Sequence, residues 1–167
     1  QKQRILTHLD PSTDALGAGY HINQSKIALG SGGVFGKGFL QGSQSHLDFL
    51  PEKQTDFIFT MIGEEFGLAG SFFVLMIFVL IMLYTYMISF LQSSQFGRLV
   101  CSGIVFMLFS YVFVNIGMVS GMLPVVGAPL PLISYGGSSM LTIFISFGIV
   151  LSASIHRFDK LEVRERY

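Results

Sequence analysis

Long apolar stretches without charged residues dominate the second half of the chain. No Asp, Glu, Lys, Arg or His occurs from Phe66 to Gly97, and none occurs from Leu99 to Ile155. A helix that crosses the hydrocarbon core of a bilayer needs about 20 mostly apolar residues. The pattern therefore predicts one membrane span in the first stretch and two in the second.

The second stretch is interrupted by residues that end helices. Its middle holds Gly121, Pro124, Gly127, Pro129, Pro131, Gly136 and Gly137. Proline inside a helix removes a backbone hydrogen bond and clashes with the preceding turn, so this part is predicted to be a loop. We expect transmembrane helices near 57–91, 99–120 and 138–155, with a loop over 121–137. The first begins at Phe57 because FIFTMI is already apolar, which places Glu64 and Glu65 in its first turns.

The first third of the chain, residues 1–56, is polar and rich in Gly, Ser, Gln and Asn. Within it, Ile22, Ile27, Ala28 and Leu29 form a short apolar stripe. An amphipathic segment of this kind is typical of a helix that lies in the membrane interface. Residues 1–56 are thus predicted to form a large loop outside the membrane, with short interfacial helices.

Composition supports a membrane protein and excludes several other classes. Of the 167 residues, 51% are hydrophobic and 12% are charged, and the mean hydropathy is +0.62. The charged fraction is about half the roughly 25% of soluble proteins. Ten basic and ten acidic residues cancel, which argues against a nucleic-acid binder. The single cysteine, Cys101, excludes an intramolecular disulfide framework. The predicted fold class is an all-α polytopic membrane protein.

The distribution of Lys and Arg predicts the orientation. Arg98 follows the first span, four basic residues lie in the tail 156–167, and the loop 121–137 has none. Basic residues favour the cytoplasmic side, so the tail is predicted to be cytoplasmic. Residues 1–56 then lie outside, although they contain no signal peptide to carry them there. We therefore expect the chain to be the C-terminal part of a longer polytopic protein, and to be inactive by itself.

The stretch GSGGVFGKG, from Gly30 to Gly38, suggests a phosphate-binding loop but does not fit one. Ser31 stands where such a loop begins with glycine, and Gly38 stands where Ser or Thr should follow Lys37. A flexible or close-packed glycine loop is the favoured interpretation. The alternative is that backbone N–H groups beside Lys37 approach a lipid pyrophosphate. The four histidines of the chain lack metal-ligand spacing.

Three carboxylates precede the first predicted span. Asp48, Glu52 and Asp56 are spaced at i, i+4 and i+8, but Pro51 interrupts the segment, so a shared helix face cannot be assumed. Asp56 beside the hydrocarbon edge is a candidate general base. From the residues alone an ordinary helix N-cap is the favoured interpretation, and a catalytic or transport role stays open as the alternative. Asn115, inside an apolar stretch, is predicted to hydrogen-bond another helix.

Three strings in the chain resemble the SEDS family (shape, elongation, division and sporulation), and its rod-shape branch in particular. The strings are DALGAGYHINQSKIALGSGGVFGKG from Asp14, LPEKQTDFIF from Leu50 followed by GEEFG from Gly63, and NIGMVSGMLPVVGAPLPLISYGGSS from Asn115. The resemblance covers essentially the whole chain, and the third string is long and specific.

The resemblance implies a ten-span bacterial inner-membrane protein whose last three spans lie in this chain. It implies a peptidoglycan glycosyltransferase that polymerises lipid II onto a growing glycan strand during elongation. Its implied partners are a class B penicillin-binding protein and other membrane proteins of the elongation complex. The essential loop aspartate of the family falls on Asp56, and a second acidic position falls on Asp48.

The remaining site residues are expectations of lower specificity. Glu52, Lys37 and Lys53 are candidate substrate contacts, and a divalent cation such as Mg²⁺ is a further source of positive charge for the pyrophosphate. A rigid loop is expected from Asn115, Gly121, Pro124, Gly127, Pro129, Pro131, Ser134, Tyr135, Gly136, Gly137 and Ser138. The alternative functions are a lipid-precursor flippase or transporter and a membrane scaffold for the crosslinking enzyme.

Overall fold

The computed structural model describes residues 18–42 and 55–156, and these residues are helical with no strand among them. The helices are α2 (Ala18–Ser31), α4 (Ile58–Phe90), α5 (Gln95–Val119) and α6 (Gly137–Ile155). The helices α4, α5 and α6 are long and apolar enough to cross a membrane. The predicted all-α class with three apolar helices is confirmed.

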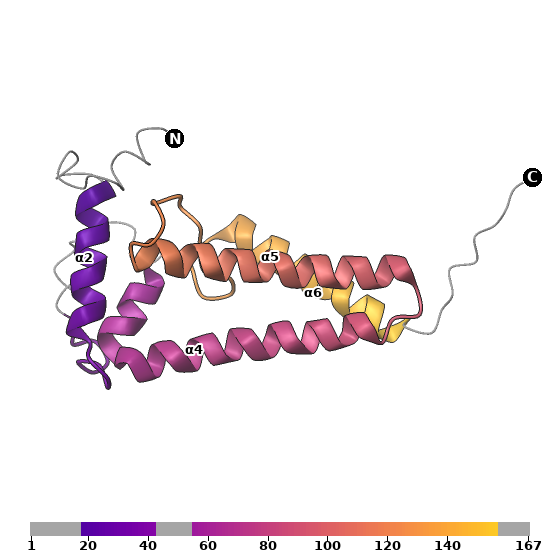
Figure 1. Cartoon of the computed structure of the whole chain (residues 1–167), viewed down its shortest axis with the longest axis horizontal. Helices are drawn as coiled ribbons and strands as arrows, with labels where there is room; N and C mark the ends of the chain where they lie inside the picture. The colour runs from indigo at the N-terminus through magenta and orange to yellow at the C-terminus, as the bar shows by residue number, and fades with distance from the viewer. Residues whose placement is uncertain (1–17, 43–54, 157–167) are drawn as a thin grey trace, which may run out of the picture.

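The helices form a bundle with α2 lying across one end (Figure 1). The helices α4, α5 and α6 run alongside one another, and the start of α4 and the loop 120–136 lie at the end covered by α2 (Figure 1). The turn between α4 and α5 and the C-terminal end of α6 lie at the opposite end (Figure 1). The described part of the polar first third therefore packs across the ends of the apolar helices.

The observed helix ends differ from the predicted ones where polar residues border an apolar stretch. Helix α5 begins at Gln95 rather than near 99, so Arg98 lies in its first turn. Polar side chains extend the helix beyond its apolar part, because a helix satisfies its own backbone with or without surrounding water. Helices α4 and α6 begin and end within one residue of the predicted ranges 57–91 and 138–155.

Helix α4 is broken at Gly67, a feature that the hydrophobic pattern did not predict. Gly67 has φ 68° and ψ −159°, outside the helical region and at a positive φ that favours glycine. The break separates a short segment, Ile58–Phe66, from the remainder of α4, and the two parts run in different directions (Figure 1). The part after the break has enough residues to extend about 35 Å, which is sufficient to span a bilayer core.

Two apolar clusters hold the helices together. Near the α2 end, the buried residues are Phe57, Phe59, Phe78, Val112, Met118, Val119 and Leu130. At the other end, Ile88, Cys101 and Val150 pack together, and Gln92 Nε2 donates to the Ala153 carbonyl at 2.8 Å. The outward faces of α4, α5 and α6 remain strongly apolar, with side chains such as Phe72 and Phe106 exposed. Such faces suit a lipid environment or contact with further helices.

Candidate functional site

Asp56 lies immediately before α4, at the end of the bundle that α2 covers, and only 8% of it is exposed. Its main-chain carbonyl accepts a hydrogen bond from Asn115 Nδ2 at 2.9 Å. The carbonyl of the preceding Thr55 accepts one from Ser134 Oγ. Two side chains from distant parts of the chain therefore fix the backbone that carries the Asp56 carboxylate.

Asn115, in the last third of α5, is fully buried and connects two loops. Besides the Asp56 carbonyl, its Nδ2 donates to the Ala128 carbonyl at 2.7 Å. Both partners are acceptors, so the amide nitrogen must face them, and this fixes the side-chain orientation. Its Oδ1 is buried and has no hydrogen-bond partner within the described residues. Asn115 was expected to bond another helix, but it bonds the turn before α4 and the 120–136 loop.

Ser134 joins the loop to itself and to the segment before α4. Its Oγ accepts a hydrogen bond from the Leu130 N–H at 2.7 Å while donating to the Thr55 carbonyl. Ser134 is 2% exposed, and the neighbouring Pro131 is also fully buried. Ser134 and Pro131 thus pack the loop into the interior, and the rigidity expected from the Pro/Gly motif stays a prediction.

Two glycines of the loop permit close approach. Gly127 has φ 77°, and a Cβ atom there would lie 3.3 Å from Asp56 Oδ2, so the loop backbone passes directly beside the carboxylate. Gly121 has φ 72°, and a Cβ atom there would lie 2.0 Å from Lys26 Cε. The side chain of Lys26, from α2, therefore covers Gly121. Lys26 was not singled out from the sequence, although it lies four residues after Ile22 of the predicted apolar stripe.

Hydroxyl groups join α2, α4 and α5 at the end of the bundle that α2 covers. Ser25 of α2 is fully buried, and its Oγ donates to the Val119 carbonyl of α5 at 2.8 Å. The same hydroxyl lies 2.8 Å from Thr60 Oγ1 of α4. Neither residue was singled out from the sequence, because an isolated Ser or Thr carries no signal of its partners.

Lys37 forms an ion pair with Glu64 of α4, with 2.8 Å between Nζ and Oε1. Glu64 is 1% exposed and the Lys37 side chain 29% exposed. The N–H groups of Lys37 and Gly38 donate to the Glu64 and Glu65 carbonyls, both at 3.0 Å. The glycine loop is thus close-packed against α4, and these N–H groups bind protein rather than a phosphate. The role of Lys37 as a substrate contact stays a prediction.

The other predicted site residues are distributed as follows. Asp48, Glu52 and Lys53 lie outside the described residues. Tyr135 is 78% exposed, Gly136 is the N-cap of α6, and Gly137 and Ser138 begin that helix, while Pro124 and Pro129 are half-buried. Across residues 18–42 and 55–156, no three His, Cys, Asp or Glu side chains gather in a way that could hold a metal ion.

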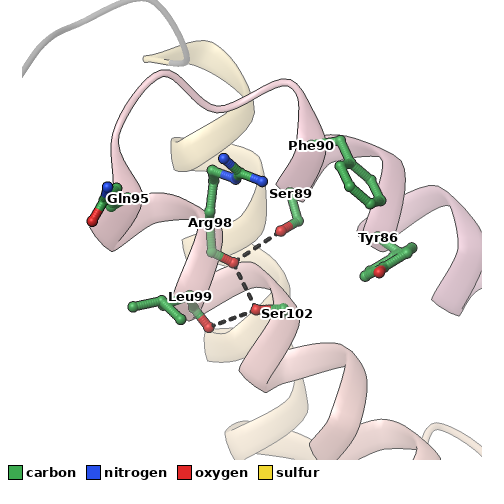
Figure 2. Close-up of a pocket in the computed structure, with 7 residues that line it drawn as sticks. All are labelled: Tyr86, Ser89, Phe90, Gln95, Arg98, Leu99 and Ser102. Atoms are coloured by element: carbon green, nitrogen blue, oxygen red, sulfur yellow. Dashed lines mark hydrogen bonds between the residues drawn. The ribbon is translucent and has the colours of Figure 1, made fainter.

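A cavity of about 340 Å³ lies at the opposite end of the bundle, lined by Tyr86, Ser89, Phe90, Gln95, Arg98, Leu99 and Ser102 (Figure 2). Here the Ser89 and Ser102 hydroxyls donate to the Arg98 carbonyl at 2.9 and 2.8 Å (Figure 2). The Ser89 bond joins the end of α4 to the first turn of α5, and the Ser102 bond lies within α5. None of the predicted site residues within 18–42 and 55–156 lines the cavity, and we assign this region a structural role.

Comparison with known proteins gives consistent matches along the chain. The sequence profile of the FtsW/RodA/SpoVE family, described as cell cycle proteins, matches residues 1–159. The peptidoglycan glycosyltransferase MrdB of Escherichia coli K12 is 55% identical over 157 residues, which are 94% of this chain and 42% of MrdB. The peptidoglycan glycosyltransferase RodA of Treponema pallidum is 45% identical over 152 residues, 91% of this chain and 35% of RodA. The stage V sporulation protein E of Bacillus subtilis is 40% identical.

Solved structures match over nearly the same extent. A chain of a peptidoglycan synthase complex that coordinates polymerization and crosslinking matches with a TM-score of 0.77 and 31% identity, covering 96% of this chain and 43% of that one. The rod shape determining protein RodA of Thermus thermophilus, as an Asp-to-Ala variant, matches with a TM-score of 0.64 and 26% identity, covering 95% and 55%. The chain thus spans about half or less of the length of each of these relatives.

Proposed function

The chain belongs to the FtsW/RodA/SpoVE family, also called SEDS, and from this membership we propose that it carries the catalytic aspartate of a peptidoglycan glycosyltransferase. The proposed substrate is lipid II, which the whole protein polymerises into glycan strands during cell elongation. The names of relatives at 55% and 45% identity support the glycosyltransferase activity. The proposal concerns the whole protein, since the chain spans 42% of MrdB.

In the proposed reaction, Asp56 is the general base. Its carboxylate accepts the proton of the acceptor sugar's 4-hydroxyl while that oxygen forms a bond to the anomeric carbon of the donor. The bond from this carbon to the pyrophosphate breaks, and its electron pair leaves with undecaprenyl pyrophosphate. Direct displacement inverts an α-linked donor into a β-1,4 linkage, and a positioned base typically contributes a factor of about 10²–10⁴.

The observation that carries this proposal is the immobilised backbone of Asp56. A general base is effective only when it is held within hydrogen-bond reach of the proton that it removes. Asn115 and Ser134 bind the carbonyls of Asp56 and Thr55, and Gly127 leaves room beside the carboxylate. An ordinary N-cap needs none of these contacts, and the N-cap position of α4 is occupied by Phe57, with Asp56 one residue before it.

The leaving pyrophosphate requires positive charge, and the described residues offer few cations near Asp56. Lys26 lies over Gly121 at the same end of the bundle, and we add it to the proposed pyrophosphate contacts Lys37 and Lys53. The carboxylate of Glu64 already neutralises Lys37, which weakens its candidacy. A divalent cation such as Mg²⁺ stays a proposed alternative, with Asp48 and Glu52 as proposed additional contacts.

The proposed setting is the bacterial inner membrane, with the C-terminal tail in the cytoplasm. The three apolar helices and the family support a multi-pass membrane protein. The proposed partner is a class B penicillin-binding protein, and the similarity to a chain of a complex that coordinates polymerization with crosslinking supports it.

A transporter or flippase of lipid precursors is the second candidate, and the break in α4 favours it. Transporters commonly use interrupted helices, whose free backbone groups bind the substrate. In α4, however, groups of the chain's own glycine loop occupy the break. This filling favours the glycosyltransferase.

Purified whole protein incubated with lipid II in detergent separates the two functions, because detergent solution has no compartments. The glycosyltransferase predicts glycan polymer in this assay. Absence of polymer from folded protein, with its class B partner present, would contradict it and favour transport.

A further inference from the structure

The break in α4 frees backbone groups, and the loop after α2 satisfies them. At Gly67 the helical ladder stops, which leaves the carbonyls of residues 64 and 65 and the N–H groups of residues 68 and 69 without helical partners. The loop supplies four hydrogen bonds of 2.9–3.0 Å: Lys37 N to Glu64 O, Gly38 N to Glu65 O, Leu68 N to Gly33 O and Ala69 N to Val34 O. A helix interrupted within an apolar span needs such partners, because unsatisfied backbone groups are costly there.

The loop docks because its backbone comes closer to the backbone of α4 than a side chain at the contact positions would allow. A Cβ atom at Gly32 or Gly36 would lie 2.0 Å from the Gly63 or Glu65 carbonyl oxygen, and one at Gly67 would lie 2.3 Å from the Gly36 nitrogen. The contacts are with backbone atoms, which cannot move aside. Gly32 and Gly36 of the loop are therefore explained by its fit into the break in α4.

The ion pair between Lys37 and Glu64 lies within this docked region. Removing Glu64 from water, at 1% exposure, is expensive, so the pair is a poor device for stability alone. A buried pair of this kind can instead select one arrangement among several, because sliding or release of the loop would leave the carboxylate without its ammonium. The pair thus discriminates between the docked and undocked loop.

The position of the pair gives this selection a consequence for the site. Glu64 belongs to the short segment Ile58–Phe66, and Asp56 lies directly before that segment. Gly67 is the only internal residue of α4 with non-helical backbone angles, so the short segment can change its direction there without distorting the rest. Contacts that hold the segment Ile58–Phe66 against the loop therefore also fix the position of the residues directly before it, including Asp56.

We propose that Lys37 and Glu64 are positioning residues. Their ion pair locks the glycine loop into the break of α4, and it thereby fixes the direction of the segment Ile58–Phe66, which Asp56 precedes. The part of this proposal that concerns activity rests on the proposed glycosyltransferase function. The locking itself does not, and it can be measured without any reaction.

The locking is measured by the distance between two spin labels in the whole protein, with native cysteines replaced and the protein in nanodiscs. Labels at Phe35 in the loop and Leu80 in α4 are suitable, because both side chains are exposed, by 86% and 57%. The proposal predicts a narrow distance distribution in the parent and in Lys37→Arg. It predicts a broadened or shifted distribution in Lys37→Met and Glu64→Gln. Glu65→Gln, which alters the neighbouring buried carboxylate, is the matched control and keeps the narrow distribution.

The positioning is measured by kinetics of lipid II polymerisation with the same variants. Loss of positioning should lower kcat by about tenfold or more with KM little changed, because misplacement by about 1 Å is enough for such losses. Lys37→Arg should retain most of kcat, because it keeps the charge.

The outcomes separate the two proposals. Unchanged distances in both Lys37→Met and Glu64→Gln would overturn the locking, whatever the rates show. Broadened distances with unchanged kcat would overturn the positioning role. A raised KM for Lys37→Met with unchanged distances would indicate a direct substrate contact and also overturn it. Failure of the glycosyltransferase itself would appear as inactive parent protein with the distances still responding to the ion pair.

Discussion

The amide of Asn115 donates to the main-chain carbonyl of Asp56 at 2.9 Å, across 59 positions of sequence. The same nitrogen holds the Ala128 carbonyl at 2.7 Å, so one side chain of α5 ties the segment before α4 to the Pro/Gly loop. A buried amide that serves two carbonyls is difficult to replace. It is the clearest structural reason for the asparagine that the sequence places in an apolar helix.

Asn115→Leu should therefore lower both the stability of the protein and its polymerisation activity. The substitution leaves two carbonyls without their donor, at about 1–3 kcal/mol for each buried group that no water reaches. We expect a lower unfolding temperature in detergent and a loss of polymerisation of about tenfold or more. Ser110→Ala is the control, because the Ser110 hydroxyl donates to the Phe106 carbonyl within the same helix. Equal effects of the two substitutions would contradict the role given to Asn115.

Ser134→Ala tests the hydrogen bonds by which Ser134 connects the loop 120–136 to the segment before α4. It removes the acceptor of the Leu130 N–H and the donor to the Thr55 carbonyl. Loss of both bonds should destabilise the protein by about 1–3 kcal/mol and reduce kcat more than it raises KM. Ser102→Ala, at the far end of the bundle, should change neither quantity. A Ser134→Ala enzyme with unchanged kcat would show that this attachment does not position Asp56.

Gly127→Ala should reduce activity through the backbone and through crowding. Its φ of 77° is unfavourable for alanine, and the added methyl would stand 3.3 Å from Asp56 Oδ2. Gly103 and Gly148, where an added Cβ meets nothing within 4 Å, are helical controls. Alanine there should be neutral or stabilise by about 0.5–1 kcal/mol. Activity measured at equal amounts of folded protein distinguishes the sites, and full activity of Gly127→Ala would contradict the close approach.

Gly36→Ala tests the docking of the glycine loop into α4. An added Cβ would lie 2.0 Å from the Glu65 carbonyl oxygen, so the loop should undock and the backbone groups beside Gly67 should lose their partners. Protease sensitivity of the loop should rise and the unfolding temperature should fall. Gly30→Ala, with open space around it, should leave both unchanged. A docked, protease-resistant Gly36→Ala protein would contradict the arrangement.

The lengths of the charge-free apolar stretches and the Pro/Gly interruption were sufficient to predict the three apolar helices, because the thickness of a bilayer constrains such helices strongly. The break at Gly67 was not predictable in this way. Glycine is common in membrane helices, and here the break depends on partners from residues 33–38, which are distant in sequence. A hydropathy pattern contains no information about such partners.

The site was predicted unevenly for a similar reason. Asp56 was a candidate base because its carboxylate lies at the edge of an apolar stretch, and the family resemblance then placed its essential aspartate there. Its interactions with Asn115, Ser134 and Gly127 depend on how loop and helices meet, which spacing along the chain does not encode. Lys37 was selected for its charge among glycines, yet the fold pairs that charge with Glu64.

The role of Asp56 as the base of the glycosyl transfer is tested by substitution of its carboxylate. Polymerisation of lipid II by the purified whole protein should be compared for Asp56→Asn and Glu65→Gln, two isosteric changes at residues that are each 8% exposed. If Asp56 is the base, Asp56→Asn should fold normally and lose activity by about 10²-fold or more, while Glu65→Gln should remain active. Normally folded Asp56→Asn protein that polymerises lipid II at the parental rate would contradict it.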